Sequence, residues 1–331
     1  MTRRKLLSVI LAVVMLSATV LFTGCKDTTV GKSNWTTNGG DPAIKKQDEV
    51  AADKLVSFGM YPQTKAAADV QKAIKDNVKI DPETGLWNEY DDEKMFAIGM
   101  EALEKIPVSY VYQSKVEGEK QAEQYYMPCG EDLYLVEAIQ WIVLETSGSD
   151  SILISSKILD GGRKYNDLYG KCTWEESSMR DWLNGTDDYN VNNGEKYNEY
   201  LNFINRAFSD EEIAKLQTVS VSCKDNDTYK TEGGNDTENL VYLLSADEFA
   251  KYFTKESGFN SMAYATAYAK GKGLKTDNNS AGVWWLRDPG ASTFMLAVDR
   301  AGVVSEGGYA VNDNAQGIRP VIKVPTAALN K

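Results

Sequence analysis

The sequence predicts an α+β fold in which helices occupy the middle of the chain and an antiparallel β-meander closes it. Three observations carry this prediction. Strand patterns mark 134–145 and 150–160, helix-start signals follow between residues 172 and 260, and short strands separated by turns fill the last fifth of the chain. Helices and strands segregated in this way favour an α+β domain over a doubly wound parallel sheet.

The N-terminus has the parts of a secretory signal. A cationic start, MTRRKLL, precedes the apolar run LLSVILAVVMLSATVLF, and the tripeptide TGC ends at Cys25. FTGC resembles the bacterial lipobox, in which the cysteine is diacylated and becomes the mature N-terminus. Residues 1–24 are therefore expected to be a lipoprotein signal peptide, with Cys25 lipidated and the protein anchored outside the cytoplasm. The alternative is an ordinary signal peptide or an anchor helix with a chance cysteine.

The rest of the chain is expected to form a tether and one domain. Residues 25–50 show no apolar period and are typical of a flexible tether. Residues 51–331 are long enough for a single α+β domain. Within it, 55–64 predicts a strand and 65–76 a helix. The stretch 65–130, irregular in its later part, is interpreted as an insertion.

Helix signals dominate the middle of the chain. The segment 172–185 predicts a helix with Thr173 as N-cap, Glu176 completing a capping box and Gly185 ending it. Further helices are expected at 195–208, after the capping boxes Ser209–Glu212 and Ser245–Glu248, and at 261–271, with a buried strand at 239–245. The closing meander is expected to comprise GVWWLRD, FMLAVD, AGVVSEGGYAV and IRPVIKV.

Composition argues against several classes of function. The chain contains no histidine, which excludes a Ser-His-Asp or Cys-His nucleophile and any histidine-ligated zinc or iron centre. Its formal net charge is −12 at pH 7, and loss of the cationic signal makes the mature chain more negative. Such a chain repels nucleic acid, so no nucleic-acid partner is expected.

Carboxylates remain as a source of hydrolytic or metal chemistry. Adjacent acidic pairs are expected by chance in a chain with 48 acidic residues, and spacing alone does not place two carboxyls across a sugar. For calcium, the candidates are Asp225 and Asp227 in CKDNDTYKTEGGNDTEN, a stretch that also suits a solvated loop. No other cofactor is expected.

Three cysteines remain once Cys25 is lipidated, an odd number for an oxidising compartment. One disulfide with a free thiol and no disulfide at all both stay open. The pair expected first is Cys172–Cys223, because these two cysteines flank one contiguous helical region.

The stretch GVWWLRDPG places neighbouring aromatic residues on opposite faces of a strand. We expect Trp284 in the core and Trp285 over a second helical layer. Arg287 is expected to pair with Asp288 or with Asp299. All of these side chains could simply fasten strands together.

A second interpretation gives this region a ligand face. Trp285, Arg287, Asn312, Asp313 and Asn314 together would offer aromatic stacking beside planar amide and carboxylate groups. Carbohydrate is often held by such a combination.

Several sequence blocks resemble an uncharacterised bacterial domain family that is common in surface and secreted proteins of Clostridia-like bacteria. The blocks are FGMYPQT, EAIQWIVLE, ILISSKILD, TWEESSMRDWLN, AFSDEEIAKL, VYLLSADEF, VWWLRDPG and GIRPVIKV. The resemblance runs from about residue 55 to 325 and is weakest over 65–130. It implies a protein on the surface of a Gram-positive bacterium.

A looser resemblance is to the C-type-lectin-like fold shared by formylglycine-generating enzymes and ligand-display proteins. It rests on the tryptophan-arginine strand, the meander and the closing G-x-R strand, and it implies a mixed α/β domain with a loop-built face. Formylglycine-generating enzymes use two cysteines near the C-terminus, whereas the last cysteine here is Cys223. The resemblance therefore implies no catalysis.

Together these observations predict a lipid-anchored, non-catalytic module that binds a glycan, peptide or protein outside the cell. The alternatives are a hydrolase with paired carboxylates and a purely structural envelope protein.

Overall fold

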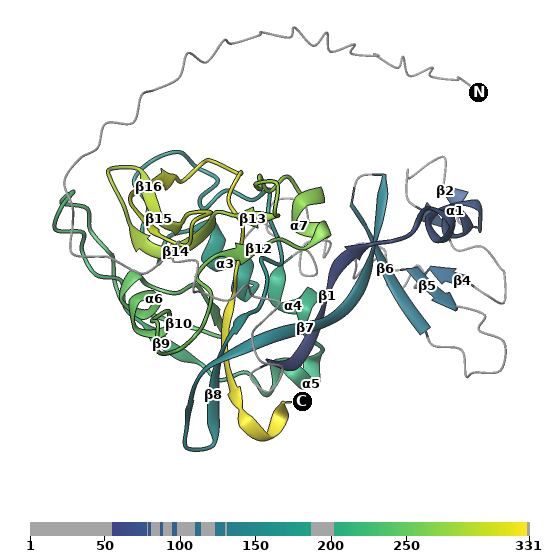
Figure 1. The fold of residues 1–331 in the computed structure, drawn as a ribbon, viewed down its shortest axis with the longest axis horizontal. Helices are drawn as coiled ribbons and strands as arrows, with labels where there is room; N and C mark the ends of the chain where they lie inside the picture. The colour runs from purple at the N-terminus through teal and green to yellow at the C-terminus, as the bar shows by residue number, and fades with distance from the viewer. Residues whose placement is uncertain are drawn as a thin grey trace, which may run out of the picture. The chain divides into compact units, whose positions relative to one another are not determined.

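The computed structural model describes residues 55–77, 79–80, 87–88, 95–97, 110–113, 123–129, 131–186 and 202–329 (Figure 1). These residues form helices and mostly antiparallel sheets, as the α+β prediction expects. The predicted signal, the tether and Cys25 lie outside the described residues. Of the helices that the structure describes, none has the length and apolar character needed to cross a bilayer.

The largest sheet has eight strands in the order β11-β17-β8-β7-β6-β5-β4, and β1 pairs with β7. Its strands are β1 Leu55–Lys65, β4 Met95–Ala97, β5 Tyr110–Gln113, β6 Glu123–Cys129, β7 Asp132–Ser147, β8 Asp150–Ser155, β11 Val241–Tyr242 and β17 Val321–Pro325. The predicted strand pair is β7 and β8, which form an antiparallel hairpin from Trp141↔Ser155 to Ser147↔Asp150. Much of the predicted insertion lies outside the described residues, and its interpretation stays a prediction.

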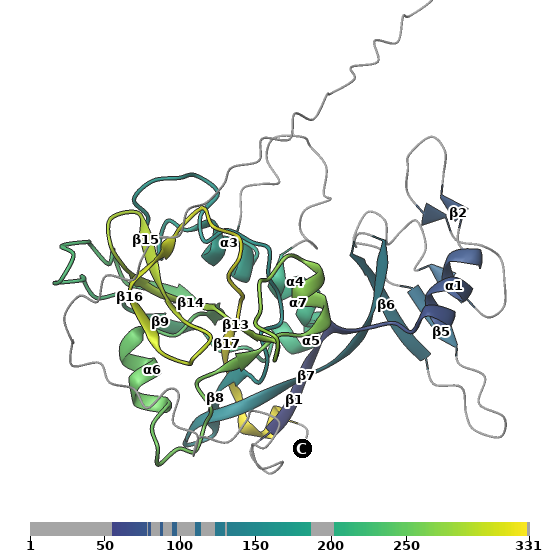
Figure 2. The same ribbon diagram turned by 45° about the horizontal axis from the view of Figure 1, so that its top comes forward.

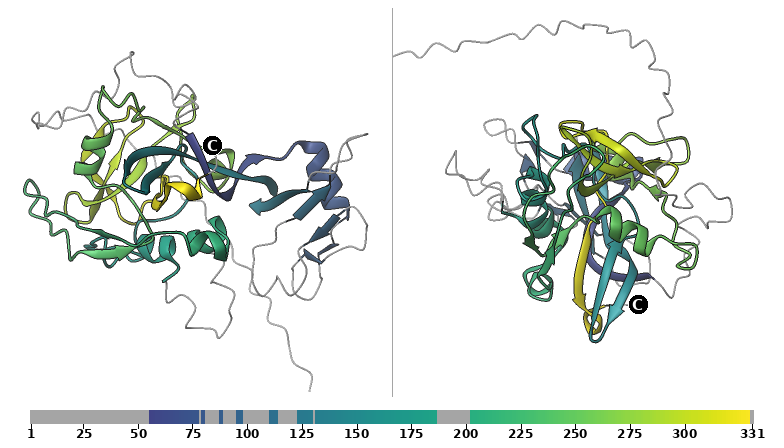
Figure 3. Two further views of the ribbon diagram at one scale, coloured as in Figure 1. Left: turned by 90° about the horizontal axis from the view of Figure 1, so that it is seen from below. Right: turned by 90° about the vertical axis from the view of Figure 1, so that its left-hand side faces the viewer.

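The closing meander has three strands. They are β14 Trp284–Pro289, β15 Phe294–Val298 and β16 Val304–Ala310, paired in that order. The expectation that IRPVIKV extends the meander is wrong. Strand β17 joins the large sheet between β11 and β8, where Val321 pairs with Tyr242 and Ile154, and Figure 3 shows β17 beside β8.

Short helices and two-stranded ladders fill the remaining segments. The helices are α1 Ala68–Asn77, α3 Ser178–Asn184, α4 Phe203–Ala207, α5 Asp210–Ile213, α6 Ala246–Tyr252, α7 Ala267–Gly271 and the 3-10 helix η5 Thr326–Ala328. The ladders pair β2 Lys79–Ile80 with β3 Trp87–Asn88, β9 Val219–Val221 with β10 Thr237–Asn239, and β12 Ala263–Tyr264 with β13 Ala281–Gly282. The helix predicted for 261–271 thus begins only at Ala267.

Two of the predicted helix starts are confirmed. Ser209 and Glu212 form a reciprocal capping box before α5, and Ser245 and Glu248 do the same before α6. Each box satisfies two backbone N–H groups that the first helical turn leaves without partners.

The start of α3 differs from the prediction. Thr173 does not cap this helix, because residues between it and Ser178 form a turn and Ser177 is the N-cap, accepting from the Arg180 N–H. The predicted end is confirmed, since Gly185 adopts the left-handed conformation with φ 69°. The helix buries Met179, Trp182 and Leu183.

One continuous apolar core joins the meander, the helices and the large sheet. Helix α6 lies against β14, and Figure 2 shows it on one side of the meander. The largest side chains of this core with under 2% exposure are Trp141, Trp174, Trp284, Trp285, Tyr61, Tyr165, Tyr268, Phe203 and Phe249, and the Arg319 side chain is equally buried. Burial of so much aromatic surface accounts for much of the driving force for folding.

Candidate functional site

Strand β14 is buried on both of its faces. Trp284 packs against Phe249 of α6, with ring centroids 5.8 Å apart, which confirms its predicted place in the core. Trp285 is also fully buried, and its ring lies 5.3 Å from that of Tyr165 and 6.4 Å from that of Tyr309. It therefore covers a loop and strand β16 rather than a helical layer, and it offers no surface to a ligand.

Arg287 is a buried structural cation. It forms an ion pair with Glu248 and donates from Nη1 to the Leu243 carbonyl at 2.8 Å and from Nε to the Ser222 carbonyl at 3.1 Å. Only 3% of its side chain is exposed. The predicted ligand-face role of Trp285 and Arg287 is thus contradicted by their burial.

The two carboxylates predicted as partners of Arg287 have other contacts. Asp288 accepts from the Ala246 N–H at 2.7 Å and so helps cap α6. Burial raises the pKa of Asp288 to about 6. Asp299 accepts from the backbone N–H groups of Ala301 and Val303, at 2.8 and 2.9 Å, and stabilises its own turn.

The predicted residues Asn312, Asp313 and Asn314 form a turn directly after β16. Asn312 and Asn314 are exposed, whereas the Asp313 carboxylate accepts from Gln316 Nε2 at 3.1 Å and from a backbone N–H. The Val311 N–H, just before this turn, donates to the Thr293 carbonyl at 3.0 Å. This bond places the turn beside the start of β15.

The two calcium candidates serve separate local contacts. Asp225 accepts from the Gly233 N–H at 2.9 Å, and Asp227 is fully exposed beside Lys230, 4.0 Å from its Nζ. Across the ranges that the structure describes, no group of three or more Cys, Asp or Glu side chains is arranged to hold a metal ion.

The predicted disulfide Cys172–Cys223 is wrong. Both cysteines, and Cys129, are free thiols. The Cys172 thiol donates to the Thr173 carbonyl at 3.2 Å, and the Cys223 thiol donates to the Arg287 carbonyl at 3.7 Å. Burial raises the pKa of both Cys172 and Cys223 to about 12, so the two thiols are protonated at neutral pH.

Sequence reasoning missed a set of exposed apolar side chains near the meander. Leu168 is 79% exposed, Tyr169 66%, Tyr229 40% and Phe294 37%. Leu168, Tyr169 and Tyr229 lie on loops, and Phe294 is the first residue of β15. A group of large apolar side chains exposed together is typical of a contact surface. We call these four residues the aromatic face.

Hydrogen bonds hold the loop that carries Tyr169 to the start of β15 and the end of β16. The Thr293 hydroxyl donates to the Tyr169 hydroxyl at 3.3 Å. Phe294 follows Thr293 and pairs with Ala310 of β16. The Asn166 N–H donates to the Val311 carbonyl at 2.9 Å, which ties the loop that carries Tyr169 to the end of the meander.

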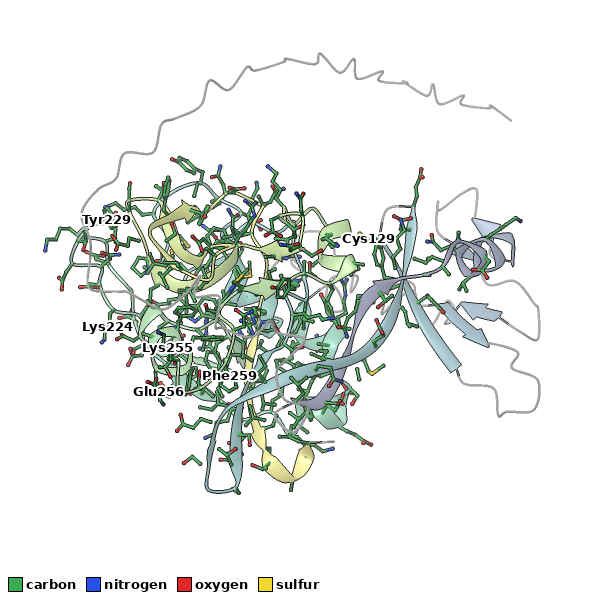
Figure 4. The ribbon with its side chains drawn as sticks, viewed as in Figure 1. Cys129, Lys224, Tyr229, Lys255, Glu256 and Phe259 are labelled. Carbon is green, nitrogen blue, oxygen red and sulfur yellow. The ribbon has the colours of Figure 1, made fainter. Side chains whose placement is uncertain are left out.

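A second loop brings Tyr229 to the same strands. Asn226 Nδ2 donates to the Pro289 carbonyl at 2.9 Å, and the Thr231 hydroxyl donates to the Gly290 carbonyl at 2.7 Å. A Cβ atom at Gly307 of β16 would lie 3.6 Å from the Tyr229 hydroxyl. Figure 4 shows Tyr229 on this loop, apart from α6.

No local pattern marked these residues. Tyr169, Tyr229 and Phe294 come from three separate stretches, and each stretch has the turn-forming Gly, Asn, Asp or Ser residues of an ordinary loop. The only available signal was the presence of large apolar residues inside such stretches.

Comparison with known proteins identifies the family. The model of a family described as a domain of unknown function (DUF6273) matches residues 149–326, more than half of the chain. The match includes β14 and β17 but begins after FGMYPQT and EAIQWIVLE, so the predicted extent from about residue 55 is confirmed only in part. Neither a curated protein nor a solved structure matches the sequence. The chain belongs to the DUF6273 family.

Proposed function

We propose that this protein is a lipid-anchored, non-catalytic module that binds glycans outside the cytoplasm through the aromatic face. The observation that carries the proposal is the exposure of Tyr169 and Tyr229 on loops that hydrogen bonds hold to the meander, and of Phe294 at the start of β15. The flat apolar sides of aromatic rings suit the C–H surfaces of sugar rings. Tyrosine adds a hydroxyl that stays hydrated or bonds a ligand.

The turn after β16 supplies polar groups beside these rings. Asn312 and Asn314 are exposed, and each side-chain amide carries both a donor and an acceptor for sugar hydroxyls. The predicted ligand face is thereby revised. Asn312 and Asn314 keep their place at the surface. Tyr169 and Phe294 take the aromatic role that was predicted for Trp285.

The proposal includes a mixed C-type-lectin-like scaffold. Loops built on a short antiparallel meander support this resemblance, since that fold binds ligands at loops that the strands hold in place. The lipobox-like FTGC supports anchoring through Cys25. Metabolic palmitate labelling of the full chain should be lost in Cys25→Ser, and labelling that persists in this variant contradicts the anchor.

The binding test uses purified residues 26–331 on an array of glycans and peptidoglycan fragments. We expect binding by the native chain and a loss of at least about tenfold in affinity, or about 1.4 kcal/mol, for each of Tyr169→Ala and Phe294→Ala. Met60→Ala is the matched control, because Met60 is an exposed apolar residue of β1 outside the aromatic face.

Two results would overturn the proposal. Binding of peptides or proteins without any glycan would contradict the ligand class. Turnover of a glycan that depends on a carboxylate would instead support the hydrolase alternative. One arm of the test contains calcium. Glycan binding that requires calcium would make Asp225 and Asp227 its ligands, a role that their present contacts do not support.

A further inference from the structure

Arg319 is a buried cation just before strand β17. Its side chain has no exposed surface. Its Nε donates to the carbonyl of Ser155, the last residue of β8, at 2.9 Å. The Nη1 and Nη2 atoms are buried as well, and neither has a hydrogen-bond partner within the described part of the chain. The N–H groups on both of these atoms are therefore left without an acceptor.

Two aromatic rings lie against the Arg319 guanidinium. Its central carbon is 5.0 Å from the centre of the Trp284 ring and 5.3 Å from that of the Phe253 ring. Phe249 and Phe259 extend this aromatic layer, since their rings contact Trp284 and Phe253 respectively. Such rings attract a cation through their π faces, but they are poor acceptors for its N–H groups. The rings therefore offset only part of the cost of burying Arg319.

Among the residues that the structure describes, no carboxylate pairs with Arg319. Burial alone lowers the pKa of Arg319 to about 9, so the guanidinium stays protonated at neutral pH. Arg287 is different, because burial lowers its pKa but the neighbouring Glu248 carboxylate raises it. A buried charge without a counter-charge is strongly unfavourable, so Arg319 needs a negative partner.

The Trp284 ring beside Arg319 carries a further donor. Its Nε1 is buried and has no hydrogen-bond partner in the described ranges of the chain. Nη1 and Nη2 of Arg319 and Nε1 of Trp284 are thus unpartnered donors on two side chains in contact. A partner for this site must accept hydrogen bonds and carry negative charge, because the site provides donors and a positive charge.

A halide ion has the properties that this site requires. It accepts hydrogen bonds from several directions, and its single charge matches that of one guanidinium. Phosphate or sulfate would leave excess negative charge among aromatic rings, where burying a charge is costly. A water molecule accepts the same hydrogen bonds but does not offset the guanidinium charge. We propose that Arg319 and Trp284 bind a chloride ion inside the core.

Bound chloride connects separate parts of the fold. Ser155, which holds the Arg319 Nε, belongs to β8 of the large sheet. Trp284 belongs to β14 of the meander, and Phe253 is the C-cap of α6. An ion that binds the native chain and not the unfolded chain raises the stability of the native state as its concentration increases. The melting temperature therefore depends on the chloride concentration.

The first test measures thermal unfolding of residues 26–331 while sodium chloride replaces sodium gluconate. Gluconate is a bulky monovalent anion, and constant ionic strength keeps the screening of surface charges unchanged. At about 0.15 M chloride we expect a melting temperature at least about 2 °C above that in gluconate. Arg319→Met should abolish this rise, because it removes the charge and leaves an apolar side chain in the core.

Arg300→Met is the matched control, since Arg300 is exposed, and this variant should keep the full rise. A second readout needs no variant and so applies even if Arg319→Met does not fold. Bromide scatters X-rays anomalously and water does not, so crystals of the native chain grown in bromide should show an anomalous peak at the Arg319 guanidinium. Absence of that peak, a native chain that does not respond to chloride, or the same rise in both variants overturns the proposal. Arg319 and Trp284 lie outside the aromatic face, so this failure leaves the proposed glycan binding standing.

Discussion

Strand β14 and the loops around it both carry aromatic residues, but only the loops present them to solvent. All six residues of β14 are buried, and Trp284 and Trp285 have no exposed surface. Tyr169, by contrast, is 66% exposed. The difference in exposure comes from what packs against each region. β15, α6 and Tyr165 cover the strand, whereas the rings on the loops are covered only in part. Availability to a ligand therefore depends on the place in the fold, not on residue type.

The largest effect is expected from truncating β14. Trp285→Ala should lower the free energy of unfolding by about 3–5 kcal/mol, because it leaves a cavity between Tyr165 and Tyr309. Chemical denaturation measures this change. Tyr169→Ala is the matched control and should change stability by less than about 0.5 kcal/mol. Equal losses for the two variants would contradict the comparison.

A somewhat smaller effect is expected at Arg287. Arg287→Ala removes the ion-pair partner of Glu248 and leaves the Leu243 carbonyl without its guanidinium donor. We expect a loss of about 2–4 kcal/mol, somewhat below that of a fully buried pair because Glu248 is partly exposed. In a double-mutant cycle with Glu248→Gln, the second substitution should cost less once Arg287 is gone. Strict additivity of the two losses would rule out the inferred coupling.

Replacement of the Asp288 carboxylate should raise the free energy of unfolding by an amount that depends on pH. Burial raises its pKa from 3.8 to about 6, so its stabilising contribution is present below about 3.8 and is lost as the pH rises through about 6. Asp288→Asn keeps an oxygen for the Ala246 N–H and should stabilise the protein by about 1–2 kcal/mol at pH 7.5. The gain should vanish below pH 4, since the native carboxyl is then neutral too. A gain that is the same at both pH values would exclude this cause.

The smallest effect concerns the cysteines. Because Cys172 and Cys223 are separate buried thiols, a reductant should leave the melting temperature of residues 26–331 unchanged. Their raised pKa also keeps them from reacting with thiol reagents at pH 8 until the protein unfolds. A fall in melting temperature on reduction would restore the disulfide hypothesis.

Local signals in the sequence predicted local structure well. The capping boxes at Ser209 and Ser245 depend on side chains three residues apart, and the β7–β8 hairpin depends on one short turn. The left-handed conformation that ends α3 is likewise determined by one residue, Gly185. Such features need no information about the rest of the chain.

Non-local structure was not predictable in the same way. Nothing in IRPVIKV shows that its partners are β8 and β11, since strand pairing depends on the whole sheet. The partner of Arg287 was missed for a related reason. Glu248 reaches it from the first turn of α6, and that packing is decided by the core rather than by sequence distance. The ring positions of Tyr169 and Phe294 depend on the same kind of long-range contact.

The most direct test of the account separates binding from stability. Tyr169→Ala/Phe294→Ala should keep the melting temperature of the native chain and lose glycan binding on the array, because both rings lie on a surface that the fold does not require. Retained binding by this double variant, or its unfolding together with the loss of binding, would contradict a ligand face built on these loops.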